Sequence, residues 1–160
     1  MAWETFLAEA TDVFVAKDTD YESRFMRALI HYNSKRGYEA ARTIWAWEVE
    51  KKLDRCRTWV KRGDLQVKGE GVHDSVIDAF NYTVQWILYM NSSRRKENPI
   101  DQLNEANFYS LAAGYQVDDW VNFWANNGLL DLTDQVDKSV ALLIANVMTI
   151  GSSETLQRRS

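Results

Sequence analysis

The sequence is poor in the residues that interrupt regular structure. Among its 160 residues there is one proline, Pro99, and there are seven glycines. So few breakers favour long helices over a sheet whose strands are joined by many turns. Apolar residues make up 46% of the chain, and its length suits one domain with a real core. We therefore expect an all-α fold, a bundle of about four core helices with extra C-terminal helices.

The chain also has little cysteine and no long apolar run. Its single cysteine, Cys56, excludes an internal disulfide, and its apolar helical surroundings predict a buried structural thiol rather than a nucleophile. No stretch approaches the roughly 20 apolar residues of a membrane span. The first residues, 1–6, lack the basic start of a signal peptide. These absences predict a cytoplasmic protein with no membrane partner.

A basic excess is missing as well. The net charge is −4, with 19 basic and 23 acidic residues. This balance argues against a nucleic-acid partner, because such binders normally carry a surplus of Lys and Arg. One local basic run, Arg94-Arg95-Lys96, is interpreted as a solvated helix end, where cations are favourable.

The apolar residues recur at helical spacing along most of the chain. This spacing predicts helices over about residues 3–16, 21–35, 39–62, 72–90, 101–114, 117–126 and 133–150. Asp18 and Asp20 are expected to end the first helix, and Asn91-Ser92-Ser93 to end the fourth. Gly37 and Gly63 are expected to end the second and third helices.

These helices suggest a division of the chain into three parts. We expect residues 1–97 to form a helical core. Residues 98–150 would form a helical extension packed on that core or on a partner subunit. The polar residues 151–160 would form a flexible tail.

A lysine interrupts the apolar stripe of the helix predicted at 39–62. At about 100° per residue, one face of this helix is apolar. That face carries Trp45, Val49, Cys56 and Trp59. Lys52 falls in its middle, with Glu48 and Arg55 at its edge. Glu48, Lys52 and Arg55 have two interpretations. They form either an exposed Glu–Lys pair whose lysine reaches water, or the wall of a pocket that needs an anionic partner or a water-filled cleft.

The helix predicted at 72–90 carries a polar strip on an otherwise apolar surface, which indicates a helix in the middle of the domain. The strip consists of Asp74, Asp78, Asn81 and Gln85. Asp74 and Asp78 are one turn apart, so they form either a solvated face or a site for Mg²⁺ or Mn²⁺. Glu70 is a candidate for a further oxygen ligand. His73 is expected to cap the helix or to be exposed.

Three blocks of the sequence, taken in order, resemble the all-α nucleotide pyrophosphohydrolase superfamily, the MazG and dimeric dUTPase group. The blocks are Lys17-Asp18-Thr19-Asp20-Tyr21, similar to a Lys-x-x-Asp-Tyr segment; Glu48 with Lys52 and Arg55, similar to a Lys-x-x-Arg helix; and residues 72–82, similar to a His-x-Asp-Asn-x-x-Asp-x-x-x-Tyr helix. The likeness is greatest to the small phage and bacterial MazG-like branch and spans about residues 17–90.

The resemblance implies hydrolysis of a (deoxy)nucleoside triphosphate to a monophosphate and pyrophosphate, with Mg²⁺ (or Mn²⁺) as cofactor. The implied metal ligands are Glu48, Asp74 and Asp78; the implied catalytic residues are Glu48, Lys52 and Arg55; the implied substrate-binding residues are Lys17, Tyr21, Lys52, Arg55, Asn81 and Tyr82. The superfamily also implies a homodimer or higher homo-oligomer, located in the host cytoplasm if the protein is phage-encoded.

One departure from the superfamily pattern keeps an alternative open. The full pattern has Glu-x-x-Glu on the first catalytic helix, whereas Glu48 and Glu50 are two residues apart. Residues that are two positions apart on a helix point in nearly opposite directions, so only one of these two glutamates can face the site. The alternative is a non-catalytic helical module that binds a nucleotide or another protein.

Overall fold

The computed structural model describes residues 2–63 and 71–150, and these residues form helices and no strand, which confirms the predicted all-α fold. The helices are α1 (Ala2–Tyr21), α2 (Arg24–Arg36), α3 (Tyr38–Arg62), α4 (Val72–Arg94), α5 (Pro99–Gln102), α6 (Glu105–Ala113), α7 (Val117–Asn126) and α8 (Gln135–Ile150). Residues 64–70, with the candidate ligand Glu70, and the predicted tail, 151–160, lie outside the described residues.

The first helix is longer than its sequence predicts. Asp18 and Asp20 were expected to end it, but α1 runs on to Tyr21 because nothing between them breaks a helix. The chain turns instead at Glu22 and Ser23, whose φ angles of 52° and 57° place both in the left-handed region. The turn thus rests on two consecutive non-glycine residues in a conformation that such residues seldom adopt.

Two further boundaries differ from the prediction. Helix α4 continues through the expected break at 91–93 and ends at Arg94. The helix expected over 101–114 is divided between α5 and α6, because Leu103 and Asn104 are extended. The Asn104 side chain caps α6 by accepting a hydrogen bond of 2.8 Å from the backbone N–H of Asn107.

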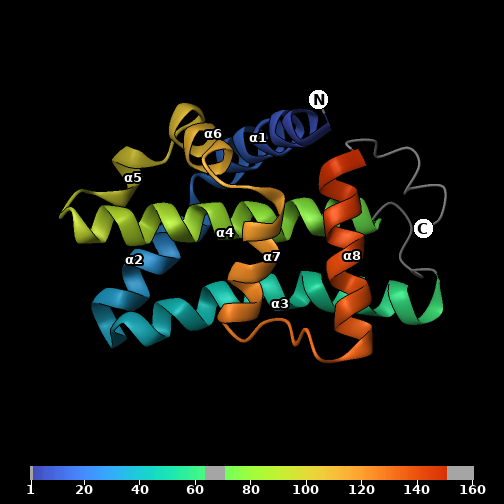
Figure 1. Cartoon of the computed structure of the whole chain (residues 1–160). Coiled ribbons are helices and arrows are strands. Elements are labelled where there is room, and N and C mark those ends of the chain that lie inside the picture. Colours follow the sequence, from blue (N-terminus) through green and yellow to red (C-terminus); the bar gives the residue numbers. More distant parts are fainter. Residues whose placement is uncertain (1, 64–70, 151–160) are drawn as a thin grey trace.

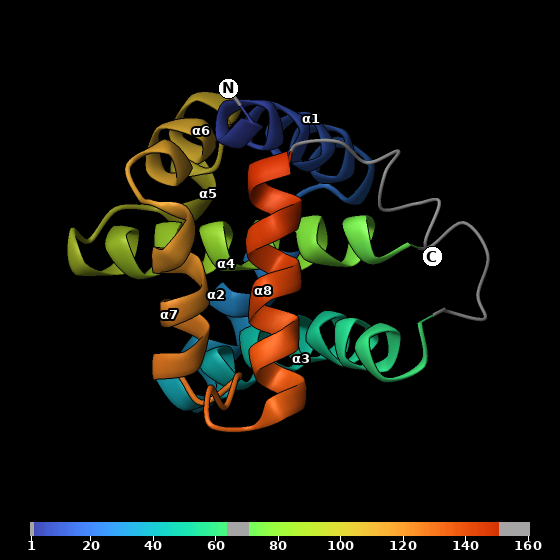
Figure 2. The same ribbon diagram turned by 45° about the vertical axis from the view of Figure 1, so that its right-hand side comes forward.

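Helix α4 lies in the middle of the molecule. In Figures 1 and 2, α3 runs antiparallel beside it, α1 and α6 cover another side, and α7 and α8 cross both α3 and α4. Most α4 side chains are buried, so the prediction of a helix buried in the middle of the domain is confirmed. The helices of residues 99–150 therefore pack on the same core as those of residues 2–62.

Aromatic side chains supply much of this core, and the tryptophans bring polar atoms with them. Trp45 stacks on Trp86 with ring centroids 5.4 Å apart. Thr83 on α4 accepts hydrogen bonds from Trp124 Nε1 at 2.8 Å and from Trp45 Nε1 at 3.4 Å. One buried hydroxyl on α4 thus satisfies indoles from α7 and α3, as buried indole N–H groups require.

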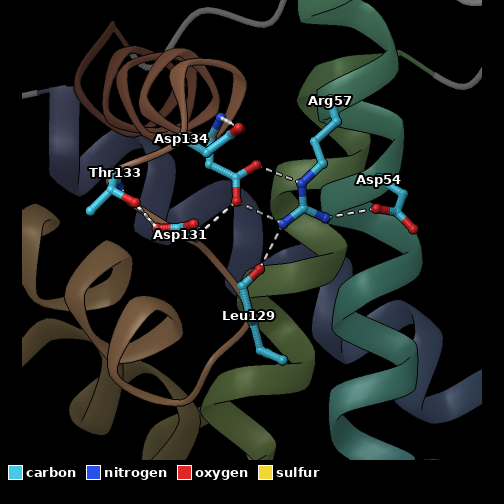
Figure 3. Close-up of polar contacts among 7 residues, drawn as sticks. Asp54, Arg57, Leu129, Asp131, Thr133 and Asp134 are labelled. Carbon is cyan, nitrogen blue, oxygen red and sulfur yellow. Dashed lines mark hydrogen bonds and ion pairs between the residues drawn. The ribbon is translucent and has the colours of Figure 1, made fainter.

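An arginine fastens α8 and the turn before it to α3. Arg57 donates to both carboxylate oxygens of Asp137, at 2.7 and 3.3 Å, and to the carbonyl of Leu129 at 2.7 Å. It also donates to Asp54 at 2.7 Å. Figure 3 shows the guanidinium between Asp54 of its own helix and the α7–α8 turn. Such planar, bidentate pairing fixes the orientation of both partners.

Among the described residues, no helix combines the length and the apolar character that crossing a membrane requires.

Candidate functional site

A cavity of about 700 Å³ opens where α1, α2, α3 and α4 meet. We call it the lysine pocket. Its lining residues are Phe14, Lys17, Asp18, Tyr21, Ser23, Arg24, Phe25, Ala28, Tyr32, Ile44, Glu48, Lys51, Lys52, Asp78, Asn81, Tyr82 and Gln85. The size is that of an ordinary small-molecule site. Of the described residues predicted for the site, it gathers all except Arg55 and Asp74.

Asp78 of α4 binds two lysines from two other helices. Its Oδ1 lies 2.6 Å from Lys17 Nζ of α1, and its Oδ2 lies 3.2 Å from Lys52 Nζ of α3. The Asp78 side chain is 15% exposed, so one half-buried carboxylate neutralises two ammonium groups. Lys52, which interrupts the apolar stripe of α3, therefore faces an anion across a cavity. The position of Lys52 thus agrees with the interpretation as a pocket wall and not with that as an exposed Glu–Lys pair.

Glu48 lies on the same wall, one turn before Lys52. Its carboxylate pairs with Lys51 at 3.2 Å and lies close enough to Tyr82 to disfavour ionisation of the tyrosine hydroxyl. Burial, followed by the Glu48 charge, raises the pKa of Tyr82 above its ordinary value. Tyr82 therefore stays a neutral donor at any physiological pH.

Asn81 lies deepest among the predicted polar residues of the pocket. It is 6% exposed, and neither its Oδ1 nor its Nδ2 has a hydrogen-bond partner among the described residues. A buried amide without partners costs free energy. Because Asn81 lines the pocket, its wall contains an unpaired acceptor and an unpaired donor.

The two remaining predicted site residues lie elsewhere. Arg55 donates a hydrogen bond of 3.2 Å to Ser75 Oγ near the start of α4. Asp74 is exposed and does not line the lysine pocket, although it precedes Asp78 by one turn. The structure therefore does not bring Arg55 and Asp74 together with the other predicted residues.

The pocket also contains residues to which the sequence pattern assigned no role. Arg24 and Tyr32 come from α2, and Lys51 pairs with Glu48. Lys51 adjoins Lys52 and lies three residues after Glu48, a spacing that predicts an ion pair. Nothing in the sequence indicated that α2 closes one side of the cavity, because that depends on the turn at Glu22 and Ser23.

His73 corrects a second expectation. It was predicted to cap α4 or to be exposed, but it is buried, and its Nε2 contacts a carboxylate oxygen of Glu9 on α1. Its Nδ1 has no hydrogen-bond partner among the described residues. Neither residue lines the lysine pocket, so this pair joins α1 to the first turn of α4 and takes no part in the candidate site.

Whether the lysine pocket could hold a metal ion depends on how its carboxylates are placed. Within residues 2–63 and 71–150, no three His, Cys, Asp or Glu side chains are grouped so that they could hold a metal ion. These residues therefore do not form a site in which protein side chains alone coordinate the metal ion. Mg²⁺ in nucleotide sites, however, commonly takes one or two protein carboxylates and completes its shell with phosphate oxygens and water. Glu48 and Asp78 fit that smaller requirement.

Comparison with known proteins identified no similar protein. No protein-family model, no curated protein and no solved structure matches the chain.

Proposed function

We propose that the lysine pocket binds a nucleoside or deoxynucleoside triphosphate and that the protein hydrolyses it to the monophosphate and pyrophosphate. The observation that carries the proposal is the gathering of Lys17, Lys52, Glu48 and Asp78 around one cavity. Lysines suit phosphate groups as mobile point charges. The resemblance of residues 17–90 to the pyrophosphohydrolase superfamily supports the same function.

The residues divide by their chemistry. Lys17, Lys51 and Lys52 bind the phosphates, and the Lys17–Asp78 and Lys52–Asp78 pairs open as the phosphates replace the carboxylate. Tyr21, which is 60% exposed at the mouth, offers a ring on which the base stacks.

The hydrolytic step follows from this arrangement. The oxygen of water forms a bond to the α-phosphorus, the bridge between the α- and β-phosphates breaks, and pyrophosphate leaves. The Glu48 carboxylate lies on the pocket wall where it can accept the proton of that water. Mg²⁺ carried by the nucleotide, held by Asp78 and Glu48, would neutralise the phosphates and polarise the α-phosphate.

Pyrophosphate release from a panel of nucleoside and deoxynucleoside triphosphates with Mg²⁺ or Mn²⁺ tests the proposal. We expect release with at least one of them, and a loss of about a hundredfold or more in Glu48→Gln and Asp78→Asn. The matched controls are Glu50→Gln and Asp74→Asn, because neither residue lines the pocket. Release from no triphosphate contradicts hydrolysis, and a comparable loss in Asp74→Asn restores Asp74 as a metal ligand.

One observation favours a second candidate, a module that binds nucleotides without hydrolysing them. Asp78 is paired with two lysines, and among the described residues no third His, Cys, Asp or Glu joins Glu48 and Asp78 in a group that could hold a metal ion. A melting temperature that rises with a triphosphate, without pyrophosphate release, would identify this function, since a ligand at 100 times its Kd stabilises the native state by about 2.7 kcal/mol.

The homo-oligomer implied by the resemblance stays a prediction. Light scattering during size-exclusion chromatography gives the mass that decides it.

A further inference from the structure

A second and larger cavity, of about 910 Å³, lies between the C-terminal half of α4 and α7. We call it the amide cavity, because four asparagine side chains lie around it: Asn33, Asn91, Asn122 and Asn126. None of its lining residues is shared with the lysine pocket. Figures 1 and 2 show α7 crossing in front of α4. The cavity is thus built partly by the C-terminal third of the chain, for which the proposed function has no use.

Aromatic rings form much of the wall of the amide cavity. Tyr38, Tyr89, Tyr115, Trp120 and Phe123 all line it. Tyr115 and Trp120 meet edge to face, with ring centroids 5.4 Å apart. Walls of this kind bind flat, apolar rings by stacking and edge contacts.

Trp120 has an unmet hydrogen bond. It is 1% exposed, and its Nε1 has no partner among the described residues. Trp124, one turn later, is equally buried, but its Nε1 donates to Thr83 Oγ1. Buried indole N–H groups usually have an acceptor, so Trp120, which lines the cavity, carries an unpaired donor in the cavity wall.

The charges around the amide cavity do not favour a phosphate-rich ligand. Its charged lining residues are Arg94 and Asp119, one of each sign. Arg94 contacts the side-chain oxygen of Asn91, and Asp119 accepts a hydrogen bond of 2.8 Å from the backbone N–H of Gln116. The lysine pocket, by contrast, gathers three lysines and Arg24 beside the carboxylates of Asp18, Glu48 and Asp78, and so has one more cation than anions. The amide cavity is therefore suited to an uncharged molecule.

Side-chain amides offer a donor beside an acceptor, which matches the adjacent donors and acceptors on the edge of a nucleobase. Asn122 and Asn126 are one turn apart on α7, so they present two such pairs side by side. Combined with aromatic walls, a free indole N–H and balanced charge, this arrangement selects a heteroaromatic ring with polar edges. We propose that the amide cavity is a second ligand site, which binds an unphosphorylated nucleoside or nucleobase.

Calorimetric titration of the full chain with adenosine, guanosine, cytidine and uridine, each without phosphate, tests this proposal. We expect at least one of them to bind with a Kd below about 1 mM. Trp120→Phe should weaken that binding about three- to tenfold, the loss expected for one neutral hydrogen bond, and Asn122→Ala/Asn126→Ala, which removes two amides, should weaken it by at least as much. Trp124→Phe is the matched control and should bind like the wild type.

The lysine pocket, with Asn81 in its wall, is the alternative site for a nucleoside, and one further variant separates the two sites. Binding that persists in Asn81→Ala and weakens in Trp120→Phe supports the amide cavity. Binding that is lost in Asn81→Ala and unchanged in Trp120→Phe overturns it, as does the absence of binding by all four nucleosides. Because no phosphate is involved, the result is independent of pyrophosphate release, so each proposal stands or fails separately.

Discussion

At the residue scale, Asp78 acts as an internal substitute for an anion. It occupies Lys17 and Lys52, the two groups that we assign to phosphate. Removing the charge of Asp78 should therefore make the pocket bind anions more tightly. The same change removes a group that the proposed reaction needs. We expect Asp78→Asn to bind pyrophosphate several-fold more tightly than the wild type, measured by calorimetry at low salt.

The control for Asp78→Asn is Lys52→Gln, which removes a cation and should weaken pyrophosphate binding. If Asp78→Asn also weakens it, the carboxylate assists anion binding instead of competing with the anion, and the assignment of the two lysines is wrong.

The two neighbouring tryptophans of α7 should differ in their effect on stability. Trp124→Phe removes a buried hydrogen bond to Thr83 and leaves a space, so it should lower the free energy of unfolding by about 2–3 kcal/mol. Trp120→Phe leaves a similar space but removes a donor that has no partner in the described part of the chain. Its loss should be smaller by about 1 kcal/mol. Urea unfolding of both variants measures the difference, and equal losses would show that Trp120 Nε1 is satisfied by water.

The thiol of Cys56 should be inert in the folded protein. Burial raises its pKa to about 12, and the thiolate is the reactive form. At pH 8 we expect a disulfide reagent to modify Cys56 only in denaturant, with reaction in native buffer limited by unfolding. Fast native labelling would mean that the core between α3 and its neighbours opens locally.

At the scale of elements, Arg57 holds α8 and the α7–α8 turn on α3. Arg57→Met keeps much of the apolar stem but leaves the mostly buried Asp137 without its cation. We expect this to cost about 3 kcal/mol of unfolding free energy. The matched variant Asp54→Asn should cost less than about 0.5 kcal/mol, because Asp54 is 70% exposed. Thermal or urea unfolding distinguishes them, and equal effects would place the stabilisation in the exposed pair.

The same pair predicts a pH dependence. Arg57, more than any other group, holds the pKa of Asp137 below its ordinary value. A carboxylate with a lowered pKa in the folded state contributes stability that is complete above the unfolded pKa of about 4 and is lost as the pH falls through the folded pKa. Between pH 7 and pH 3 the wild type should therefore lose more stability than Arg57→Met. A parallel loss in both proteins would contradict a role for Asp137.

At the scale of the whole molecule, the sequence predicted which side chains meet better than it predicted where helices end. Lys52 and Asp78 were recognised because each interrupts an apolar pattern, and such an interruption is visible in one helix alone. The ends of α1 and α4 were missed because Asp, Asn and Ser are helix enders only where the chain also changes direction. The burial of His73 was missed because its partner, Glu9, is on a distant helix.

The second cavity was beyond sequence analysis for a similar reason. Its asparagines come from α2, α4 and α7, and none of them interrupts an apolar stripe. Only the crossing of α7 over α4 brings them together, and crossing angles depend on side-chain packing rather than on periodicity.

The central place of α4 affects how the chain behaves while it is being synthesised. Phe80 on α4 contacts Phe6, Phe108 and Trp120, with ring centroids 5.2, 6.4 and 4.7 Å apart. A ribosome delivers α4 well before α6 and α7, so a nascent chain displays an apolar helix for as long as the last third remains unsynthesised. Such exposed surface attracts chaperones and promotes aggregation. The aromatic residues of α6 and α7 thus serve as the cover that ends this exposure.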